Sequence, residues 1–474
     1  MKIIIVGAGI GGLAAYHALK KHLSDLPPGI NSSIYVKIVE SHTSPRTTTR
    51  TIGGGLGLAP NGLRAIASIS PKAATYIQER GFPGALVTFR NSSGGRLGVY
   101  QNGRGERYGF DQLMVPRAVV HEALLLDLPE GDVEWGKRVH SLDAGEEDGK
   151  MELVYEDGTK EQADLVIGAD GVRSVVRDSL FAGQYTAAYD GLTGVGGFLP
   201  LSSLPKLLQD SLKTEGVTMT FGKLGFFGYS LCSPPPEQLI HNVPAPFIQW
   251  WSIYECASPP DKHTVNVADI KAQLLERHAE WKSPHDSSEG AVYRTIIELG
   301  SRVTVSEETE ANHEHGLDTS LLILPRYVTP RLPHWSNVSS TSKRAVQGRI
   351  VLLGDAAHAM PPDSGQGVSC AVEDAVAYAL LLKHYLSQDS SSLPETSPLQ
   401  RAATAYEKLR MPRVHRILDF AKHNGDAKKR VGWLGQKLRD LVMWVLCKLP
   451  ETIGDSMFMY DAEKMVREYL SERQ

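Results

Sequence analysis

The sequence has no hydrophobic stretch long enough to cross a lipid bilayer. The longest apolar run near the C-terminus, LVMWVLC at 441–447, is far shorter than the roughly 20 residues that a spanning helix needs. Strand-like apolar sequence begins at Lys2, which leaves no room for the basic start and apolar core of a signal peptide. We therefore expect a cytoplasmic protein without a transmembrane segment.

A strong net charge and cysteine motifs are also missing. Lys and Arg number 50 against 54 Asp and Glu, so the formal net charge is -4 and no strong field attracts nucleic acid. The four cysteines show no CxxC or Cys/His spacing, which indicates neither a disulfide framework nor a zinc site: Cys232, Cys256, Cys370 and Cys447. We expect small-molecule partners, no nucleic acid and no metal.

The sequence does contain several short apolar runs that end in glycine. IIIV at 3–6 runs into GAGIGG, and ADLVIGADGVRS (163–174) and RIVLLGDAAH (349–358) repeat this form. Such unbroken runs are typical of parallel strands buried on both faces. Residues 186–335 differ, since runs such as FIQWWSIYEC (247–256) favour an antiparallel sheet. With 474 residues, we expect two or three domains in an α/β protein.

The first glycine cluster fits a dinucleotide-binding turn. Gly7, Gly9 and Gly12 form G-x-G-x-x-G between a predicted strand and a predicted helix, the context that gives this pattern its meaning. The first glycine allows the tight turn, the second lets a pyrophosphate approach the backbone, and the third lets the helix pack on the strand. The helix N-terminus adds N–H donors and partial positive charge.

Glu40 ends the second predicted strand, IYVKIVE at 34–40, where a carboxylate can accept hydrogen bonds from ribose hydroxyls. It lies further from the glycines than the usual spacing of about 20 residues, an excess that SDLPPGINSS (24–33) explains. A carboxylate here disfavours a 2'-phosphate, so these residues leave FAD and NAD as candidates. The alternative is a merely solvated glutamate.

Three motifs together resemble one enzyme family. Gly7–Gly12, GADGVRS (168–174) and GDAAHAMPPDSGQGVSCAVEDAVAYAL (354–380) resemble the single-component FAD-dependent aromatic monooxygenases of the p-hydroxybenzoate hydroxylase and salicylate hydroxylase type, especially fungal secondary-metabolism members. GLGLAPNGLRAI (55–66) and PRAVVHEALL (116–125) also match. The resemblance favours FAD, which would be tightly but not covalently bound.

The resemblance implies a domain organisation. A Rossmann-like FAD-binding domain would comprise residues 1–80, 112–185 and 336–400, with an inserted, mainly antiparallel β-sheet substrate domain at 81–111 and 186–335. Residues 401–474 would form a C-terminal helical region, and the protein would be a monomer or a homodimer.

The resemblance also implies roles for individual residues. Asp355 would bind the ribityl-pyrophosphate part of FAD, and Arg117 would contact the flavin. Gly54 or Gly55 would bring backbone close to the cofactor, and Asp170 would serve both FAD and a visiting NADPH. Pro361 and its neighbour would place backbone at the flavin edge, or would simply stiffen the loop.

A later glycine cluster precedes a predicted helix with one buried face, marked by Val368, Val372, Ala375, Val376 and Ala379. Gly365, Gln366 and Gly367 then lie at the positive end of this helix, where N–H groups could hold the negative charge of a reduced flavin. A plain tight turn is the alternative. We expect His358 to be a buried histidine that caps a turn.

In this family NADPH reduces the flavin, and O2 adds to give a C4a-hydroperoxide that hydroxylates or epoxidises the substrate. The substrate implied here is a small hydrophobic aromatic or indolic molecule, in secondary-metabolite biosynthesis. The cofactor supplies the difficult chemistry, which explains the lack of a nucleophile motif. A halogenase or reductase of the same fold, and a non-catalytic flavin-binding sensor, are the alternatives.

Substrate-binding residues are harder to assign. Some relatives carry an arginine where this sequence has Gly196 or Gly197, so capture of a phenolate by arginine is in doubt. Tyr229 falls near an expected catalytic tyrosine, although cross-strand packing explains it equally well. Trp250, Trp251 and Tyr254 would line an aromatic pocket or alternate in a core.

One further helix is predicted near the C-terminus, with one apolar side at Leu434, Leu438, Leu441, Val442, Val445, Leu446 and Leu449. Packing on the domains is the simplest interpretation. Peripheral membrane contact through 434–449, or contact with a partner, is the alternative.

Overall fold

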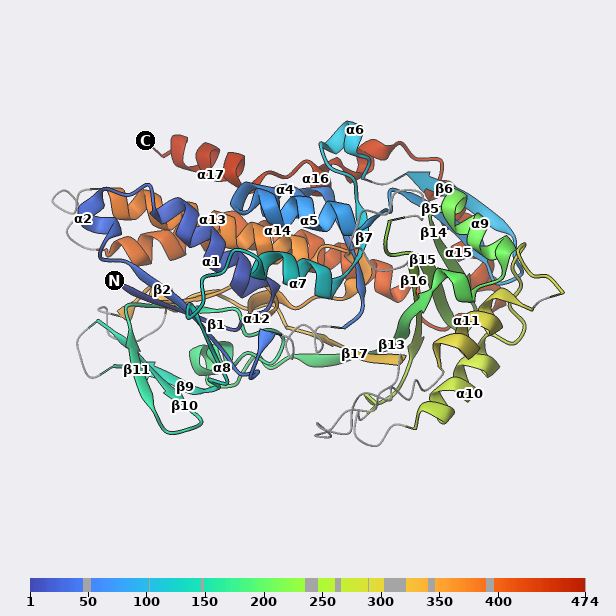
Figure 1. The fold of residues 1–474 in the computed structure, drawn as a ribbon, viewed down its shortest axis with the longest axis horizontal. Coiled ribbons are helices and arrows are strands. Elements are labelled where there is room, and N and C mark those ends of the chain that lie inside the picture. Colours follow the sequence, from blue (N-terminus) through green and yellow to red (C-terminus); the bar gives the residue numbers. More distant parts are fainter. Residues whose placement is uncertain are drawn as a thin grey trace.

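The structure is a computed structural model. It describes residues 1–45, 53–101, 103–145, 149–234, 246–260, 266–288, 290–301, 321–339, 346–388 and 396–473. Figure 1 shows helices α1 (Ile10–Leu23), α13 (Gly367–Ser387) and α14 (Pro398–Asp426) beside a parallel sheet at the end that holds both termini. A larger sheet forms the opposite end of the molecule.

The parallel sheet has the strand order β18-β12-β1-β2-β8. Its strands are β1 (Lys2–Val6), β2 (Tyr35–Glu40), β8 (Val133–Trp135), β12 (Leu165–Gly168) and β18 (Ile350–Leu352). Every neighbouring pair runs parallel, which confirms the parallel strands predicted from the apolar runs. The carboxyl ends of β1, β12 and β18 therefore lie at one edge of the sheet.

Helices cover this sheet because their small and apolar side chains allow close packing. α13 packs on α1 and α14, and also on α4 and α17. The other helices of this part are α2 (Pro28–Asn31), α4 (Pro60–Ile69), α5 (Pro71–Arg80), α6 (Gly105–Tyr108), α7 (Arg117–Leu125), α8 (Val175–Phe181), α12 (Asp355–His358), α16 (Asp455–Phe458) and α17 (Ala462–Ser471).

Two three-stranded sheets accompany the parallel sheet. One has the order β11-β10-β9 and the other β3-β7-β4. Their strands are β9 (Val139–Ala144), β10 (Met151–Tyr155) and β11 (Lys160–Ala163), and β3 (Gly55–Leu58), β4 (Phe82–Pro83) and β7 (Leu113–Pro116).

The large sheet has the order β17-β13-β16-β15-β14-β5-β6. Its strands are β5 (Leu86–Asn91), β6 (Arg96–Gln101), β13 (Ala188–Pro200), β14 (Val217–Gly222), β15 (Gly225–Leu231), β16 (Phe247–Glu255) and β17 (Leu321–Val328). Only the β14–β5 pair is parallel among these described strands. Residues 86–101 thus join a sheet whose other strands come from 188–328.

The two faces of the large sheet have different surroundings. Side chains alternate along a strand, so Phe227, Tyr229 and Leu231 share one face. They pack in one cluster with residues of α9 (Lys206–Glu215), α10 (Val267–Arg277) and α11 (Val292–Gly300), and we call this the helix-covered face. Gln249 and Trp251 point to the opposite face.

Residues 401–474 are distributed over both ends of the molecule rather than forming one unit. α14 and α17 pack on α13, whereas α15 (Trp433–Leu446) packs on β6 of the large sheet.

A buried ionic cluster joins α13 to α14. Nε of Arg410 donates to Oδ1 of Asp374 at 2.8 Å, and its Nη1 lies 2.9 Å from Oε2 of Glu373. Arg413 also donates to both carboxylate oxygens of Glu373. Burial alone would raise the pKa values of the two acids, but the neighbouring cations hold both pKa values below their usual range.

The cluster generates a stability prediction. Arg410→Met leaves Glu373 and Asp374 buried without this partner, so we expect the free energy of unfolding to fall by about 3–5 kcal/mol. Arg467→Met removes a guanidinium that is 68% exposed and pairs with Glu463, and should change it by less than about 1 kcal/mol. Urea unfolding of the two variants measures both values, and equal midpoints would contradict the assigned importance of the cluster.

Candidate functional site

Three strand ends that are distant in sequence meet at one edge of the parallel sheet. A Cβ on Gly7, after β1, would stand 2.6 Å from the carbonyl oxygen of Ala169, after β12. Ala371 of α13 lies between the glycine turn after β1 and the turn after β18. Its Cβ would be 3.6 Å from a Cβ on Gly11 in the first turn and 2.9 Å from a Cβ on Gly354 in the second. We call this meeting point the cradle.

The three glycines of the first turn have different surroundings. Gly7 has φ +102°, which favours glycine, and a Cβ on Gly12 would stand 1.9 Å from the carbonyl oxygen of Gly7. No described atom lies within 4 Å of a Cβ built on Gly9. Gly7 and Gly12 are therefore required by the turn itself, whereas Gly9 leaves its backbone open to a ligand.

Glu40 is anchored to this turn. Its Oε2 accepts from the backbone N–H of Ala8 at 2.7 Å, and its Oε1 accepts from the backbone N–H of His42 at 2.9 Å. Burial would raise the pKa of Glu40, but these hydrogen bonds hold it below its usual value. An ionised acceptor therefore stands at the end of β2, beside the glycine turn.

Arg117 is the first residue of α7, which contacts both Gly54 and the glycine turn after β1. Its backbone N–H donates to the carbonyl oxygen of Gly54 at 3.0 Å. One turn along the helix, His121 Nε2 lies 2.8 Å from the carbonyl oxygen of Ala8 in the glycine turn. The side-chain Nε of Arg117 is buried without a hydrogen-bond partner among the described residues. This buried donor is available to a ligand in the cradle.

The N-terminus of α13 closes the cradle. Gly365 has φ +62°, and a Cβ there would meet only the carbonyl oxygen of Gly57 of β3, at 3.8 Å. Gln366 is 1% exposed, accepts from Asn61 and has no partner for its Nε2 in the described chain. Pro361 precedes the short turn 362–364, and Val368 lies in the first turn of α13. The first N–H groups of α13 follow directly.

Asp355 and His358 lie on the short helix α12, which follows β18 directly. His358 is 2% exposed, and its Nε2 lies 2.6 Å from Oδ2 of Asp374. The same oxygen accepts from the backbone N–H of Gly354 at 3.1 Å. The ionic cluster thus fixes the turn that carries Asp355, and His358 is buried in that turn as predicted.

Asp170 occupies a capping position. Its Oδ1 accepts from Oγ of Ser174 at 2.5 Å, and its Oδ2 accepts from the backbone N–H of Val176 at 3.1 Å. Burial raises its pKa. Both oxygens therefore cap the start of α8, a structural role that the sequence pattern did not indicate.

The opposite face of the large sheet borders the cradle at Gly54 and Gly55. A Cβ on Gly54 would stand 3.6 Å from Leu324, and one on Gly55 would stand 1.4 Å from Oε1 of Gln249. Gln249 also donates to Ser230 at 3.2 Å. The sheet face with Gln249 and Leu324 is thus the one that adjoins the cradle.

Tyr229 lies on the helix-covered face, away from the Gln249 side. It is 1% exposed, its ring lies 6.5 Å from that of Tyr293, and burial raises its pKa to about 12. Trp250 and Tyr254 belong to the same packed cluster, whereas Trp251 points to the opposite face. The structure therefore favours the packing interpretation for Tyr229, Trp250 and Tyr254.

Gly196 has no room for the arginine found in some relatives. A Cβ at this position would stand 2.3 Å from the carbonyl oxygen of Trp250 on the neighbouring strand. The close approach of β13 and β16 excludes any side chain here.

A second charge cluster was not predicted. Nη2 of Arg326 lies 2.7 Å from Asp363 and 2.8 Å from Asp190, and Nζ of Lys428 lies 2.6 Å from Asp363. Asp363 belongs to the loop before α13, and Arg326 to β17, so the cluster ties the cradle to the large sheet. Its outermost members, Asp190 and Lys428, are 238 positions apart in the chain, so no local pattern reveals the cluster.

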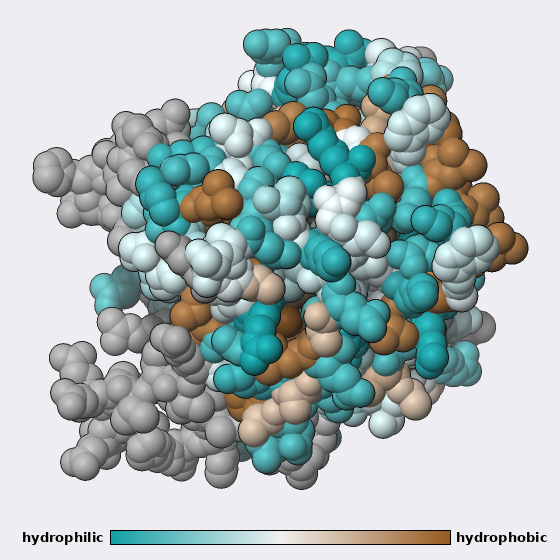
Figure 2. Space-filling model, turned by 90° about the vertical axis from the view of Figure 1, so that its right-hand side faces the viewer, coloured by the Kyte–Doolittle hydropathy of each residue, from teal (hydrophilic) through white to brown (hydrophobic). Residues whose placement is uncertain are grey.

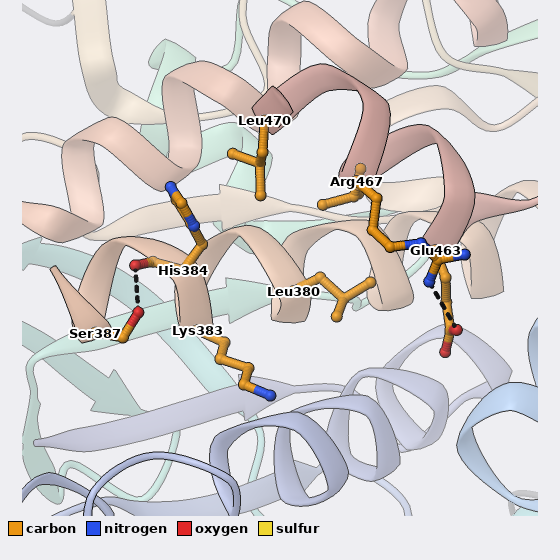
Figure 3. A pocket seen from close by; sticks show the side chains of 8 residues that line it. Leu380, Lys383, His384, Ser387, Glu463, Arg467 and Leu470 are labelled. Carbon is orange, nitrogen blue, oxygen red and sulfur yellow. Dashed lines mark hydrogen bonds and ion pairs between the residues drawn. The ribbon is translucent and has the colours of Figure 1, made fainter. Parts of the chain in front are cut away.

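One pocket lies elsewhere. An open pocket of about 280 Å³ lies between the C-terminal half of α13 and α17, lined by Leu380, His384, Glu463 and Leu470 among others (Figure 3). At 1.5 Å per residue, Leu380 lies about 20 Å along α13 from the helix start. This pocket is separate from the cradle.

The cradle fits FAD in three respects: open backbone at Gly9, an ionised acceptor at Glu40, and buried donors without partners at Arg117 and Gln366. A family model described as "FAD binding domain" matches residues 1–195 and 324–420, more than half of the chain. The chain belongs to this FAD-binding family.

Relatives with assigned activities are aromatic hydroxylases. The chain is 29% identical over 441 residues to salicylate hydroxylase of Pseudomonas putida, covering 90% of this chain and 86% of the relative. It is 25% identical over 430 residues to hispidin-3-hydroxylase of Neonothopanus nambi, covering 87% and 86%. The protein is an FAD-dependent monooxygenase of the aromatic hydroxylase type.

Solved structures show the same fold. Klebsiella pneumoniae HpxO complexed with FAD and uric acid has a TM-score of 0.69 at 21% identity, covering 99% of this chain and 97% of that one. A salicylate hydroxylase substrate complex has a TM-score of 0.68 at 18% identity, covering 99% and 98%.

Two alanine substitutions distinguish a ligand-binding glycine from a structural one. Gly9 has φ -70° and ψ 178°, which alanine adopts, so Gly9→Ala should leave the apoprotein's urea midpoint unchanged and weaken FAD binding at least tenfold. Gly12→Ala should lower stability by about 1–3 kcal/mol through overpacking. Flavin titration and unfolding measure the two effects. Unchanged FAD affinity in Gly9→Ala would show that the pyrophosphate lies elsewhere.

Proposed function

We propose that this protein uses NADPH and O2 to add one oxygen atom to a small aromatic or indolic substrate. Two electrons come from NADPH, one oxygen atom enters the product and the other leaves as water. The observation that carries the proposal is the meeting of the cradle with one face of the large sheet at Gly54 and Gly55. The same contact would bring a cofactor and a substrate together.

Each part of the cradle has a distinct role in this proposal. Glu40 would accept from the adenosine ribose, Gly7, Gly9 and Gly12 would hold the pyrophosphate, and Asp355 would bind the ribityl side. Gly54, Gly55 and Arg117 would lie along the flavin, with Arg117 Nε as donor. Bound FAD would supply hydride acceptance and oxygen activation.

The start of α13 would stabilise negative charge. Its first N–H groups and the partnerless Nε2 of Gln366 are donors at the positive end of a helix of 21 residues. Gly365 and Gly367 would allow the ring to approach them, while Pro361 and Val368 would border it. Asp170 would act mainly by holding the turn after β12, so its contact with FAD or NADPH would be indirect.

The substrate would lie against the opposite face of the large sheet, at Gln249, Ser230 and Leu324. Apolar side chains would hold an aromatic ring there, and the Gln249 amide would orient a polar substituent. Tyr229 would not touch the substrate, since it lies on the helix-covered face. A general base also works best with a pKa near the working pH, and that of Tyr229 is raised to about 12.

The proposed division of the chain follows from this. Residues 81–111 and 186–335 would bind substrate, and 1–80, 112–185 and 336–400 would bind FAD. A role in secondary metabolism is supported by similarity to fungal proteins such as the FAD-dependent monooxygenase pigN of Monascus ruber, 24% identical over 437 residues.

Turnover assays test the proposed reaction. Purified protein should retain FAD and oxidise NADPH faster when an accepted aromatic or indolic compound is present, with a product heavier by one oxygen atom. Mass spectrometry under labelled O2 measures the incorporation. Substrate-independent NADPH oxidation without product would contradict a monooxygenase, and a halogenated or hydrogenated product would support the alternative enzymes of this fold.

Two variants test which face of the large sheet binds the substrate. Gln249→Leu should raise KM for the substrate at least fivefold, because an amide beside the cradle is lost. Tyr229→Phe should change kcat/KM by less than twofold, because the hydroxyl of Tyr229 lies on the helix-covered face. Steady-state kinetics measure both, and a larger loss in Tyr229→Phe would return the catalytic role to that tyrosine.

A further inference from the structure

Helix α15 is attached to the protein by a side that carries polar groups and Met443, which packs on an apolar cluster of the large sheet. Arg439 is 7% exposed and donates to the carbonyl oxygens of Gly222 at 2.7 Å and Ala427 at 2.9 Å. Gln436 donates to Oγ of Ser92 at 3.2 Å. Cys447, directly after the helix, packs so closely on β6 that a Cβ on Gly98 would stand 2.5 Å from it.

The apolar side of α15 points outward. The side chains of Trp433, Leu434, Leu438 and Leu441 are 63%, 73%, 62% and 55% exposed, and Val442, Val445, Leu446 and Leu449 are exposed as well. This reverses the usual arrangement, in which a surface helix buries its apolar side. The prediction that these residues pack on the domains is therefore wrong, because the backbone and polar contacts orient the helix the other way.

The exposed apolar surface extends beyond the helix. The backbone N–H of Val431 donates to the carbonyl oxygen of Lys223, which places the exposed Leu224 near the helix start. Figure 2 looks at this end of the molecule and shows hydrophobic side chains gathered along its right edge. Contiguous exposed apolar surface of this kind marks an interaction site.

The free charges on and beside α15 are mainly basic. Between 427 and 450 the chain carries six basic residues and one acid, Asp440. Of the six, Lys428 and Lys429 pair with Asp363 and Asp426, and Arg439 is buried. Arg430, Lys437 and Lys448 are exposed, whereas Asp440 is partly buried, and this burial raises its pKa. A cationic rim around an apolar surface is complementary to anionic lipid headgroups above acyl chains.

Two exposed tryptophans lie near the two ends of α15. Trp433 and Trp444 lie at the start and near the end of α15 and are 63% and 49% exposed. Nζ of Lys448 lies 5.8 Å from the Trp444 ring centroid. Tryptophan and lysine together are favoured at the boundary between headgroups and acyl chains.

We propose that α15 docks this protein on the surface of an anionic lipid bilayer, with the helix lying in the interface. Among the described residues, no helix is both long and apolar enough to span a membrane. A second copy of the chain fits the patch less well, because a two-fold axis would bring the exposed cations of two copies together, and α15 offers one acid, Asp440, to pair them.

Flotation of the full-length holoprotein with vesicles tests the proposal. The vesicles are phosphatidylcholine alone or phosphatidylcholine mixed with phosphatidylserine. We expect binding to the mixed vesicles that weakens with salt. Leu438→Glu/Leu441→Glu should lose at least about a hundredfold in affinity, since each buried leucine contributes about tenfold. Lys437→Gln/Lys448→Gln should lose about fivefold per lysine.

A matched control carries the same substitution elsewhere. Leu126→Glu/Leu207→Glu changes two leucines, 44% exposed directly after α7 and 50% exposed on α9, and should bind vesicles like the wild type. Flavin absorbance and NADPH oxidation verify that all variants are folded.

Three results would overturn the proposal. The first is wild-type protein that binds neither kind of vesicle. The second is equal binding by the wild type and Leu438→Glu/Leu441→Glu, which would place the contact on another surface. The third is a dimer in sedimentation velocity that this variant converts to monomer, without vesicle binding, which would assign the patch to a second copy.

Discussion

Glu373 and Asp374 are adjacent in the N-terminal half of α13, and Arg410 and Arg413 of α14 neutralise them inside the core. Isolated ionised side chains at this depth would be very costly, so the packing of α13 on α14 depends strongly on the meeting of these four groups. Asp374 also holds the N–H of Gly354 and the ring of His358, and Glu373 accepts from Asn61, which reaches Gln366. One cluster thereby fixes the turn that carries Asp355 and the N-terminus of α13.

The cluster of Arg326, Asp190, Asp363 and Lys428 has a comparable effect at the next boundary. It joins β13 and β17 of the large sheet to the loop that enters α13. Transfer of an oxygen atom requires the substrate to be held at a fixed position relative to the cofactor. Two ionic clusters on either side of the same loop give that loop a fixed position relative to both the parallel sheet and the large sheet.

The outward apolar side of α15 fits an enzyme whose proposed substrates are hydrophobic. Aromatic and indolic molecules partition into bilayers, so a protein docked at the interface would work where its substrate is concentrated. α15 packs on β6, at the edge of the large sheet, whereas α13 and α14 pack on each other beside the parallel sheet. Docking through α15 would therefore leave the parallel sheet and the cradle unaffected.

The sequence alone determined the strands and turns of the cradle. Apolar runs that end in glycine specify buried parallel strands locally, and G-x-G-x-x-G at 7–12 with Glu40 specifies a dinucleotide turn, because glycine geometry and a strand-end carboxylate are local properties. Asn61, His121, Arg326 and Asp363 could not be found this way, since their partners lie far away in the chain. Glu373 and Asp374 lie inside an apolar helix, and their partners Arg410 and Arg413 belong to another helix far along the chain.

Side-chain direction was decided only by the tertiary structure. The sequence places Tyr229 on a strand and Leu438 on an amphipathic helix, but which face of each element meets the core depends on neighbouring elements. β15 turns Tyr229 toward α11, away from the cradle. Hydrogen bonds from Arg439 to the carbonyl oxygens of Gly222 and Ala427 turn Leu438 outward. Periodicity fixes which residues share a face, whereas only packing partners fix where that face points.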